Sequence, residues 1–188
     1  TTERRDALNT TADWNTSTGI VRAAPAFDIG TGRDGDLLVG TGASGSGTSV
    51  LDLSELGHAR TVDVTRIGVA DVATSSSLPP FSPGDEALIL VQWSNDANDV
   101  GTFEFKTVAS VATGRLVFTT PLTKTFSPTA EISGRRVTVT RVPHFRDVTI
   151  LGNGQLTTSA PTGTAGSNLR GGSGVLAFRA SGAVLIQG

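Results

Sequence analysis

The sequence contains no cysteine, which excludes disulfide bonds, thiolate metal sites and cysteine-based catalysis. It also lacks any apolar run approaching the roughly 18 residues that a membrane-spanning helix requires. Charged residues make up only 17% of the chain, and the formal net charge is −2. No basic field is therefore available to hold nucleic acid or an anionic membrane surface, and we expect neither as a partner.

Small residues are frequent where charged residues are scarce. The 188 residues include 23 glycines, and serine and threonine are abundant. Because glycine and threonine are poor helix formers, this composition favours strands and turns over helices. The length fits one large domain or two small ones, and it is sufficient to bury a hydrophobic core without covalent cross-links.

Several central segments alternate apolar and polar residues with the two-residue period of a half-buried strand, as in "RTVDVTRIGVA". The segment "DEALILVQW" is instead a short, continuous apolar run after Pro-Gly, so we expect a buried strand there. Further strand-like segments are "VGTFEFKTVASV", "GRLVFTTPL" and "GRRVTVTRVPHF". Strands separated by brief turns predict an antiparallel sandwich or barrel.

After Pro143 the chain consists of short apolar runs punctuated by small residues, namely "VTILG", "GQLTT", "GVLAFRA" and "AVLIQG". This pattern is typical of a parallel β-solenoid, in which inward side chains of successive coils stack and small residues turn the corners. The alternative is an ordinary hairpin pair in a sandwich. For "GVLAFRASGAVLIQG" the two interpretations differ on whether Ser181-Gly182 is a hairpin turn or a solenoid corner.

These patterns divide the chain into three predicted parts. Residues 1–18 form an N-terminal arm, residues 19–143 an antiparallel β-domain, and residues 144–188 the start of a β-solenoid. The segment 71–84 is rich in proline and serine, which makes it a candidate boundary inside the β-domain.

The second half, roughly residues 82–188, resembles the leading region of large, glycine-rich bacterial surface proteins built on right-handed parallel β-helices. The residues that carry the resemblance are "PGDEALILVQW", the strand-like segments after it and the tail "GGSGVLAFRASGAVLIQG". The resemblance implies an all-β fold in which an antiparallel sandwich-like or barrel-like domain leads into the first coils of a right-handed parallel β-helix. It also implies an extracellular or cell-surface location and a structural or adhesive role, and it carries no site residues across.

Two glycine-rich motifs lack the context of a nucleotide site. Gly30–Gly35 fits G-x-G-x-x-G, but the residues after it are not helical, so a turn between strands is favoured. Gly40–Ser49 contains no lysine and leads into no helix, which excludes a P-loop.

The two histidines, His58 and His144, are far apart and outside metal-binding motifs. His144 is predicted at a loop or sheet edge.

One acidic segment is a candidate calcium site. Asp96, Asn98 and Asp99 lie close together in "SNDANDVG", and Ca²⁺ prefers such oxygen ligands at alternate positions. No glutamate follows to complete an EF-hand, and Asn and Asp are also common hairpin residues. A hairpin turn is therefore the alternative interpretation, and no other cofactor is expected.

Trp93 is a candidate sugar-stacking residue, together with Phe103 and Phe105. Core packing is the favoured interpretation of the two phenylalanines, because they share one side of a strand.

Two carboxylate pairs, Asp34/Asp36 and Asp85/Glu86, raise the question of polysaccharide cleavage. The solenoid-like tail contains only one acidic residue, Asp147, which argues against an active cleft there.

The sequence thus favours a non-enzymatic structural, capping and assembly module of an extracellular bacterial β-helix protein. Its partners would be a downstream β-solenoid or like chains, bound through the C-terminal strand edge at Val184–Ile186. The alternative is a carbohydrate-binding or adhesive module that recognises cell-surface glycans. A third hypothesis is a fragment of a polysaccharide-cleaving β-helix enzyme or a phage- or particle-associated β-protein.

Overall fold

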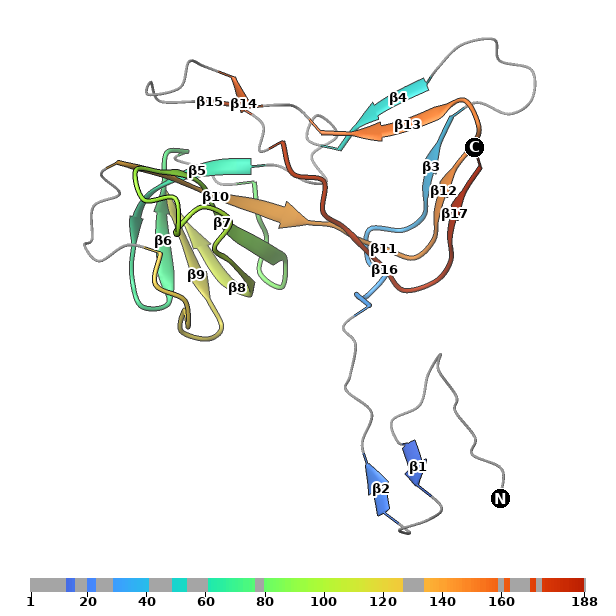
Figure 1. The fold of residues 1–188 in the computed structure, drawn as a ribbon, viewed down its shortest axis with the longest axis horizontal. Helices are drawn as coiled ribbons and strands as arrows, with labels where there is room; N and C mark the ends of the chain where they lie inside the picture. The colour runs from blue at the N-terminus through green and yellow to red at the C-terminus, as the bar shows by residue number, and fades with distance from the viewer. Residues whose placement is uncertain are drawn as a thin grey trace.

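The computed structural model describes residues 13–15, 20–22, 29–40, 49–53, 61–76, 80–126, 134–158, 161–162, 170–171 and 174–187. Within these residues the secondary structure consists of strands alone, which confirms the all-β prediction (Figure 1). No helix in the described part of the chain is long and apolar enough to cross a membrane.

Six antiparallel strands close into a barrel, in the order β10-β5-β6-β9-β8-β7. They are β5 (Thr61–Ile67), β6 (Asp71–Thr74), β7 (Glu86–Ser94), β8 (Phe103–Ala112), β9 (Arg115–Phe118) and β10 (Arg135–Val142). The sequence left a sandwich and a barrel open, and the closed order of strands decides for the barrel. Every strand-like segment predicted between residues 60 and 142 contributes one of its strands.

The barrel interior is a single apolar cluster. Its fully buried members include Ile89 on β7, Leu116 on β9 and Val139 on β10. The run "ALILV" of β7 pairs with β10 along most of its length and is almost entirely buried, as a continuous apolar strand should be. The barrel therefore has a core of its own.

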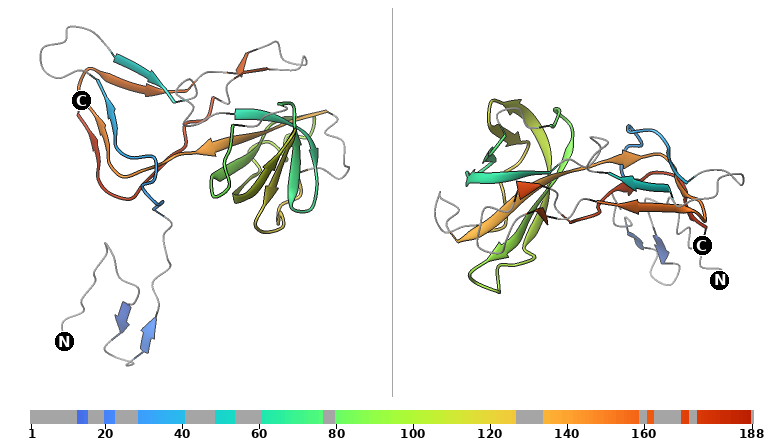
Figure 2. Two further views of the ribbon diagram at one scale, coloured as in Figure 1. Left: turned by 180° about the vertical axis from the view of Figure 1, so that it is seen from behind. Right: turned by 90° about the horizontal axis from the view of Figure 1, so that it is seen from above.

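Seven of the remaining described strands form short parallel ladders, whereas the other four form two antiparallel pairs. The ladder β17-β12-β3 joins β3 (Leu37–Val39), β12 (Val148–Ile150) and β17 (Val184–Ile186). A second pairs β4 (Ser49–Asp52) with β13 (Gly154–Thr157), and a third pairs β11 (His144–Phe145) with β16 (Arg179–Ala180). Residues 29–40 with 49–53, residues 144–158 and residues 174–187 are thus three stacked solenoid coils, called here the first, second and third coil (Figure 2).

The barrel is inserted between the first and second coils. The sequence placed residues 19–143 in one antiparallel domain, but β3 and β4 pair in parallel with β12 and β13. The described residues of 29–53 therefore belong to the solenoid. The segment 71–84 begins with β6, a strand of the same closed barrel, so residues 71–74 belong to the barrel and mark no boundary between domains.

The C-terminal segment is a solenoid coil. Strands β16 and β17 pair in parallel with β11 and β12, so Ser181-Gly182 is a solenoid corner within the third coil and no hairpin turn. Of the predicted N-terminal arm only residues 13–15 are described. These form β1 (Asp13–Asn15), which pairs with β2 (Ile20–Arg22), and a further short pair joins β14 (Pro161–Thr162) to β15 (Arg170–Gly171).

Candidate functional site at the barrel–solenoid junction

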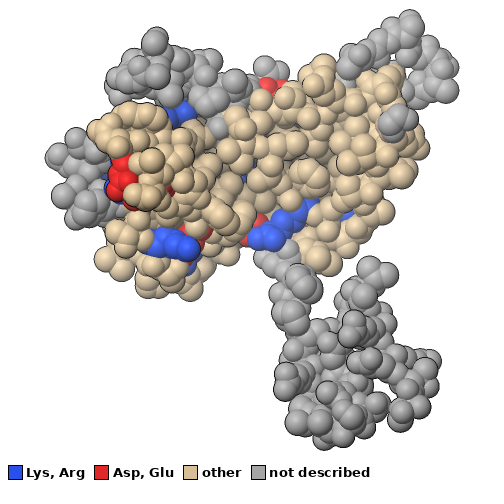
Figure 3. Space-filling model, viewed as in Figure 1, with Lys and Arg blue, Asp and Glu red and all other residues tan. Residues whose placement is uncertain are grey.

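Charged side chains from the barrel and from all three coils meet where the two parts join (Figure 3). We call this set the junction cluster. Its members are Arg33, Asp34, Asp85, Glu86, Arg141, His144 and Arg179. They come from the first coil, from β7 and the turn before it, from the end of β10, and from β11 and β16.

Glu86, at the start of β7, binds two coils at once. Its carboxylate accepts hydrogen bonds from Nε and Nη2 of Arg179 at 2.5 and 2.6 Å. One oxygen also lies 3.0 Å from Nε2 of His144. Only 10% of the Glu86 side chain is exposed. A single buried carboxylate of the barrel therefore holds the second and third coils together.

His144 connects Glu86 to the first coil. The backbone N–H of Thr31 donates to Nδ1 of His144 at 3.2 Å, so the hydrogen-bond pattern assigns the ring proton to Nε2, which donates to Glu86. The backbone N–H of His144 also donates to Asp34 at 2.7 Å. The prediction of a loop or sheet-edge histidine is refined, because His144 lies in the short strand β11 and is buried.

Arg141, near the end of β10, bridges the first coil and the barrel. Its Nη2 donates to Asp34 at 2.6 Å, and its Nε lies 3.0 Å from Asp85, which also pairs with Arg33. Burial would raise the pKa of Asp34, but the bonds from Arg141 and from the His144 backbone outweigh it and lower that pKa.

The junction cluster balances three arginines against three carboxylates. Each of these carboxylates forms an ion pair with an arginine of the cluster. This pairing suits a structural joint better than an acid–base site. The two predicted carboxylate pairs, Asp34/Asp36 and Asp85/Glu86, do not stay together as pairs in the structure. Asp34 and Asp85 share Arg141, whereas Asp36 pairs with Arg146 on the surface. Among the described residues no group of three or more acids or histidines is arranged to hold a metal ion.

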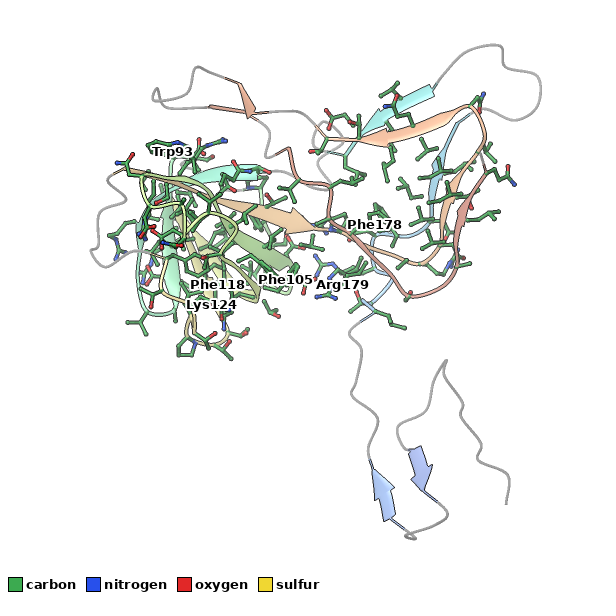
Figure 4. All side chains as sticks on the ribbon, in the orientation of Figure 1. Trp93, Phe105, Phe118, Lys124, Phe178 and Arg179 are labelled. Atoms are coloured by element: carbon green, nitrogen blue, oxygen red, sulfur yellow. The ribbon has the colours of Figure 1, made fainter. Side chains whose placement is uncertain are left out.

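A small pocket of about 210 Å³ lies beside the junction cluster. It is lined by Phe105, Val142, Leu176, Ala177, Phe178 and Arg179. The guanidinium carbon of Arg179 lies 5.2 Å from the centre of the Phe105 ring, at cation–π distance, and Phe103 packs edge-on against Phe105 at 5.8 Å. Figure 4 shows Phe105, Phe178 and Arg179 together at this side of the barrel.

The core-packing interpretation of Phe103 and Phe105 is wrong. Both share one face of β8, as predicted, but they are 52% and 40% exposed. Val108 faces the barrel core, and because side chains alternate along a strand, the two rings point outward. Trp93 is also partly exposed, but it lies at the other end of the barrel from Phe105 (Figure 4). The three aromatic residues therefore do not form one face.

The acidic loop between β7 and β8 has the internal bonds of a turn. Asp96 accepts hydrogen bonds from the backbone and side-chain nitrogens of Asn98, both at 3.0 Å. Asp99 accepts a bond from Ser94 at 3.2 Å and pairs with Arg135. These contacts favour the hairpin interpretation. Calcium binding by Asp96, Asn98 and Asp99 stays a prediction that a calcium titration followed by thermal unfolding tests.

Phage tailspikes are among the solved structures similar to this chain, whereas no family model and no curated protein matches it. The tailspike gp49 of Pseudomonas phage LKA1 is 17% identical, with a TM-score of 0.30, over 47% of this chain and 15% of that chain. The tailspike gp61 of Pseudomonas phage phi297 is 19% identical, with a TM-score of 0.30, over 50% and 14%. The gp54 tailspike of Acinetobacter baumannii bacteriophage AP22, in complex with an A. baumannii capsular saccharide, is 13% identical, with a TM-score of 0.32, over 69% and 21%.

These similarities concern the fold alone. The chain spans about a fifth or less of the length of the tailspikes it matches. The strand pairing of this chain shows its parallel coils directly. The chain is thus an all-β protein in which an antiparallel barrel joins the coils of a parallel β-solenoid.

Proposed function

We propose that this chain is a non-enzymatic structural and capping module of an extracellular β-helix protein, in which the barrel stabilises the first coils of the solenoid. The observation that carries the proposal is the junction cluster. Glu86 of the barrel binds the second and third coils, and Arg141 and Asp85 bind the first. Location at a bacterial or particle surface belongs to the same proposal.

The shortness of the solenoid strands supports a stabilising role for the barrel. The solenoid strands are only two to four residues long, and a few such coils bury little apolar surface by themselves. The barrel has its own core. Because it lies between two coils in the chain, it holds both the end of the first coil and the start of the second. An inserted barrel therefore provides a rigid base on which short parallel strands are held in register.

Hydrogen exchange of single amides tests this proposal. In Glu86→Ala we expect faster exchange of β3, β12 and β17 amides while the barrel amides keep their protection, because only the joint is weakened. Glu104→Ala is the matched control, since Glu104 pairs with Lys106 within the barrel. Unchanged protection of the coils in Glu86→Ala would count against the proposal. So would a polysaccharide-cleaving activity of the purified chain that Glu86→Gln abolishes.

Carbohydrate binding is the second candidate function, and the outward-facing Phe103 and Phe105 beside the pocket favour it. Aromatic rings offer apolar faces to the C–H faces of sugars, and exposed apolar rings next to a pocket are typical of binding sites. A glycan array of bacterial surface polysaccharides tests it. Binding lost in Phe105→Ala and kept in Trp93→Ala would place the site at the junction, and an array without a binder would dismiss it.

A further inference from the structure

The inward side chains of the solenoid are buried in the first coil and exposed in the third. Leu37, Val148 and Val184 are partners in register across the ladder. Their exposed fractions are 7%, 0% and 50%. The second stack behaves in the same way, because Val39 is 2% exposed whereas Ile186 is 69% exposed. The solenoid core is thus closed at the first coil and open at the third.

The backbone edge of the third coil is open as well. Strand β17 is the last strand of the ladder β17-β12-β3 and pairs only with β12 among the described residues. An exposed edge strand with apolar side chains is a template on which another strand is added. Leu185, between the two inward residues, is also half-exposed, so β17 presents apolar surface on both of its faces.

We propose that β17 binds a parallel β-strand of a further solenoid coil, with apolar side chains at the two alternate positions opposite Val184 and Ile186. This inference rests on the proposed structural function and names the partner of that module. Continuity with the existing interface selects this partner, because β12 covers β3 in the same way, with Val148 opposite Leu37 and Ile150 opposite Val39. A second copy related by a two-fold axis would bring an antiparallel strand to β17 and would not continue this ladder.

The corner before each strand adds a specific element of recognition. Asp36 accepts a hydrogen bond from the backbone N–H of Asp147 at 3.3 Å, and Asp147 accepts one from the backbone N–H of Ala183 at 2.7 Å. Each carboxylate thus binds the corner of the next coil. The third coil has Ala183 at this position, which has no carboxylate to offer to the strand that follows. Ala183→Asp restores the missing acceptor and is expected to strengthen strand addition.

A peptide copying residues 144–158 is the probe, because this segment stacks on β3 in the protein. We expect millimolar peptide to slow amide exchange in β17 at least about tenfold in the full chain, with a larger effect in Ala183→Asp. The matched control peptide carries aspartate in place of the residues corresponding to Val148 and Ile150, and we expect it to have no effect.

Three results would overturn the proposal. They are no protection of β17 by the peptide, equal protection by the control peptide, and a dimer by sedimentation in which β17 is already protected without peptide. The last result would assign β17 to a second copy. Each is distinguishable from failure of the proposed function, because the effect of Glu86→Ala on the coils is measured without any peptide.

Discussion

Glu86 and Arg179 lie far apart in the sequence, yet the carboxylate accepts two parallel hydrogen bonds from the guanidinium at 2.5 and 2.6 Å. This bidentate geometry is among the strongest forms of an ion pair between side chains. It joins the first residue of a barrel strand to the third coil of the solenoid, and His144 adds the second coil at the same carboxylate. The contact makes the coils depend on the barrel.

Removal of this carboxylate should be costly. Glu86→Ala removes the carboxylate that pairs with the partly buried Arg179, and we expect a loss of about 3–5 kcal/mol in the free energy of unfolding the coils. Arg66→Ala is the control, because Arg66 is half-exposed and its partner Asp71 keeps a second ion pair with Arg115. That variant should lose less than about 1 kcal/mol. Urea unfolding of both variants measures the difference, and equal losses would contradict the structural role of Glu86.

The open end of the solenoid predicts unequal effects of the same substitution. Val148 and Val184 are partners in register, but only Val148 is fully buried. Val148→Ala should therefore lower the free energy of unfolding by on the order of 2 kcal/mol, because it leaves a cavity. Val184→Ala should cost less than about half of that. Chemical denaturation checks the order, and a larger effect of Val184→Ala would mean that β17 is covered in solution.

Gly30 lies against the junction cluster with a positive φ of 90°. A Cβ atom there would approach Cβ of Arg179 to 2.8 Å and the ring of His144 to 3.2 Å. Gly35 also has a positive φ, of 76°, but a Cβ atom there meets nothing. We expect Gly35→Ala to cost about 1–2 kcal/mol from backbone strain alone, and Gly30→Ala to cost more. Thermal unfolding separates strain from steric conflict, and equal melting temperatures would dismiss the conflict.

Glu104 should make stability depend on pH in acid. Burial raises its pKa, but bonds from Lys106, Thr123 and the Lys124 backbone outweigh this and lower the pKa from 4.5 to about 2. Because the folded pKa lies below the unfolded one, the stabilisation is complete above pH 4.5 and is lost as the pH falls toward 2.

Glu104→Gln should therefore be less stable than the parent at pH 7 and should lose less stability between pH 4.5 and 2. Urea unfolding at several pH values measures both slopes. Parallel curves for the two proteins would show that Glu104 contributes nothing to the acid sensitivity.

Local sequence pattern determined the strands of this protein. Alternation in the segment around Val62 and Val64 and the apolar run of β7 led to correct strand predictions, because side-chain burial on a strand follows a two-residue period. The same reasoning identified solenoid strands after Pro143. It placed Phe103 and Phe105 on one face of β8, but it could not decide which face points inward, since that depends on which side of the closed barrel Val108 occupies.

Only the tertiary structure decided which strands are partners. The segments "DLLVG", "DVTILG" and "AVLIQG" are all short apolar stretches that end at a glycine, yet nothing in such a stretch states that the first pairs with the second across an inserted barrel. The junction cluster was hidden for the same reason. Its arginines and carboxylates are ordinary charged residues in the sequence, and they become a buried ion-pair network only because the barrel and the three coils bring them together.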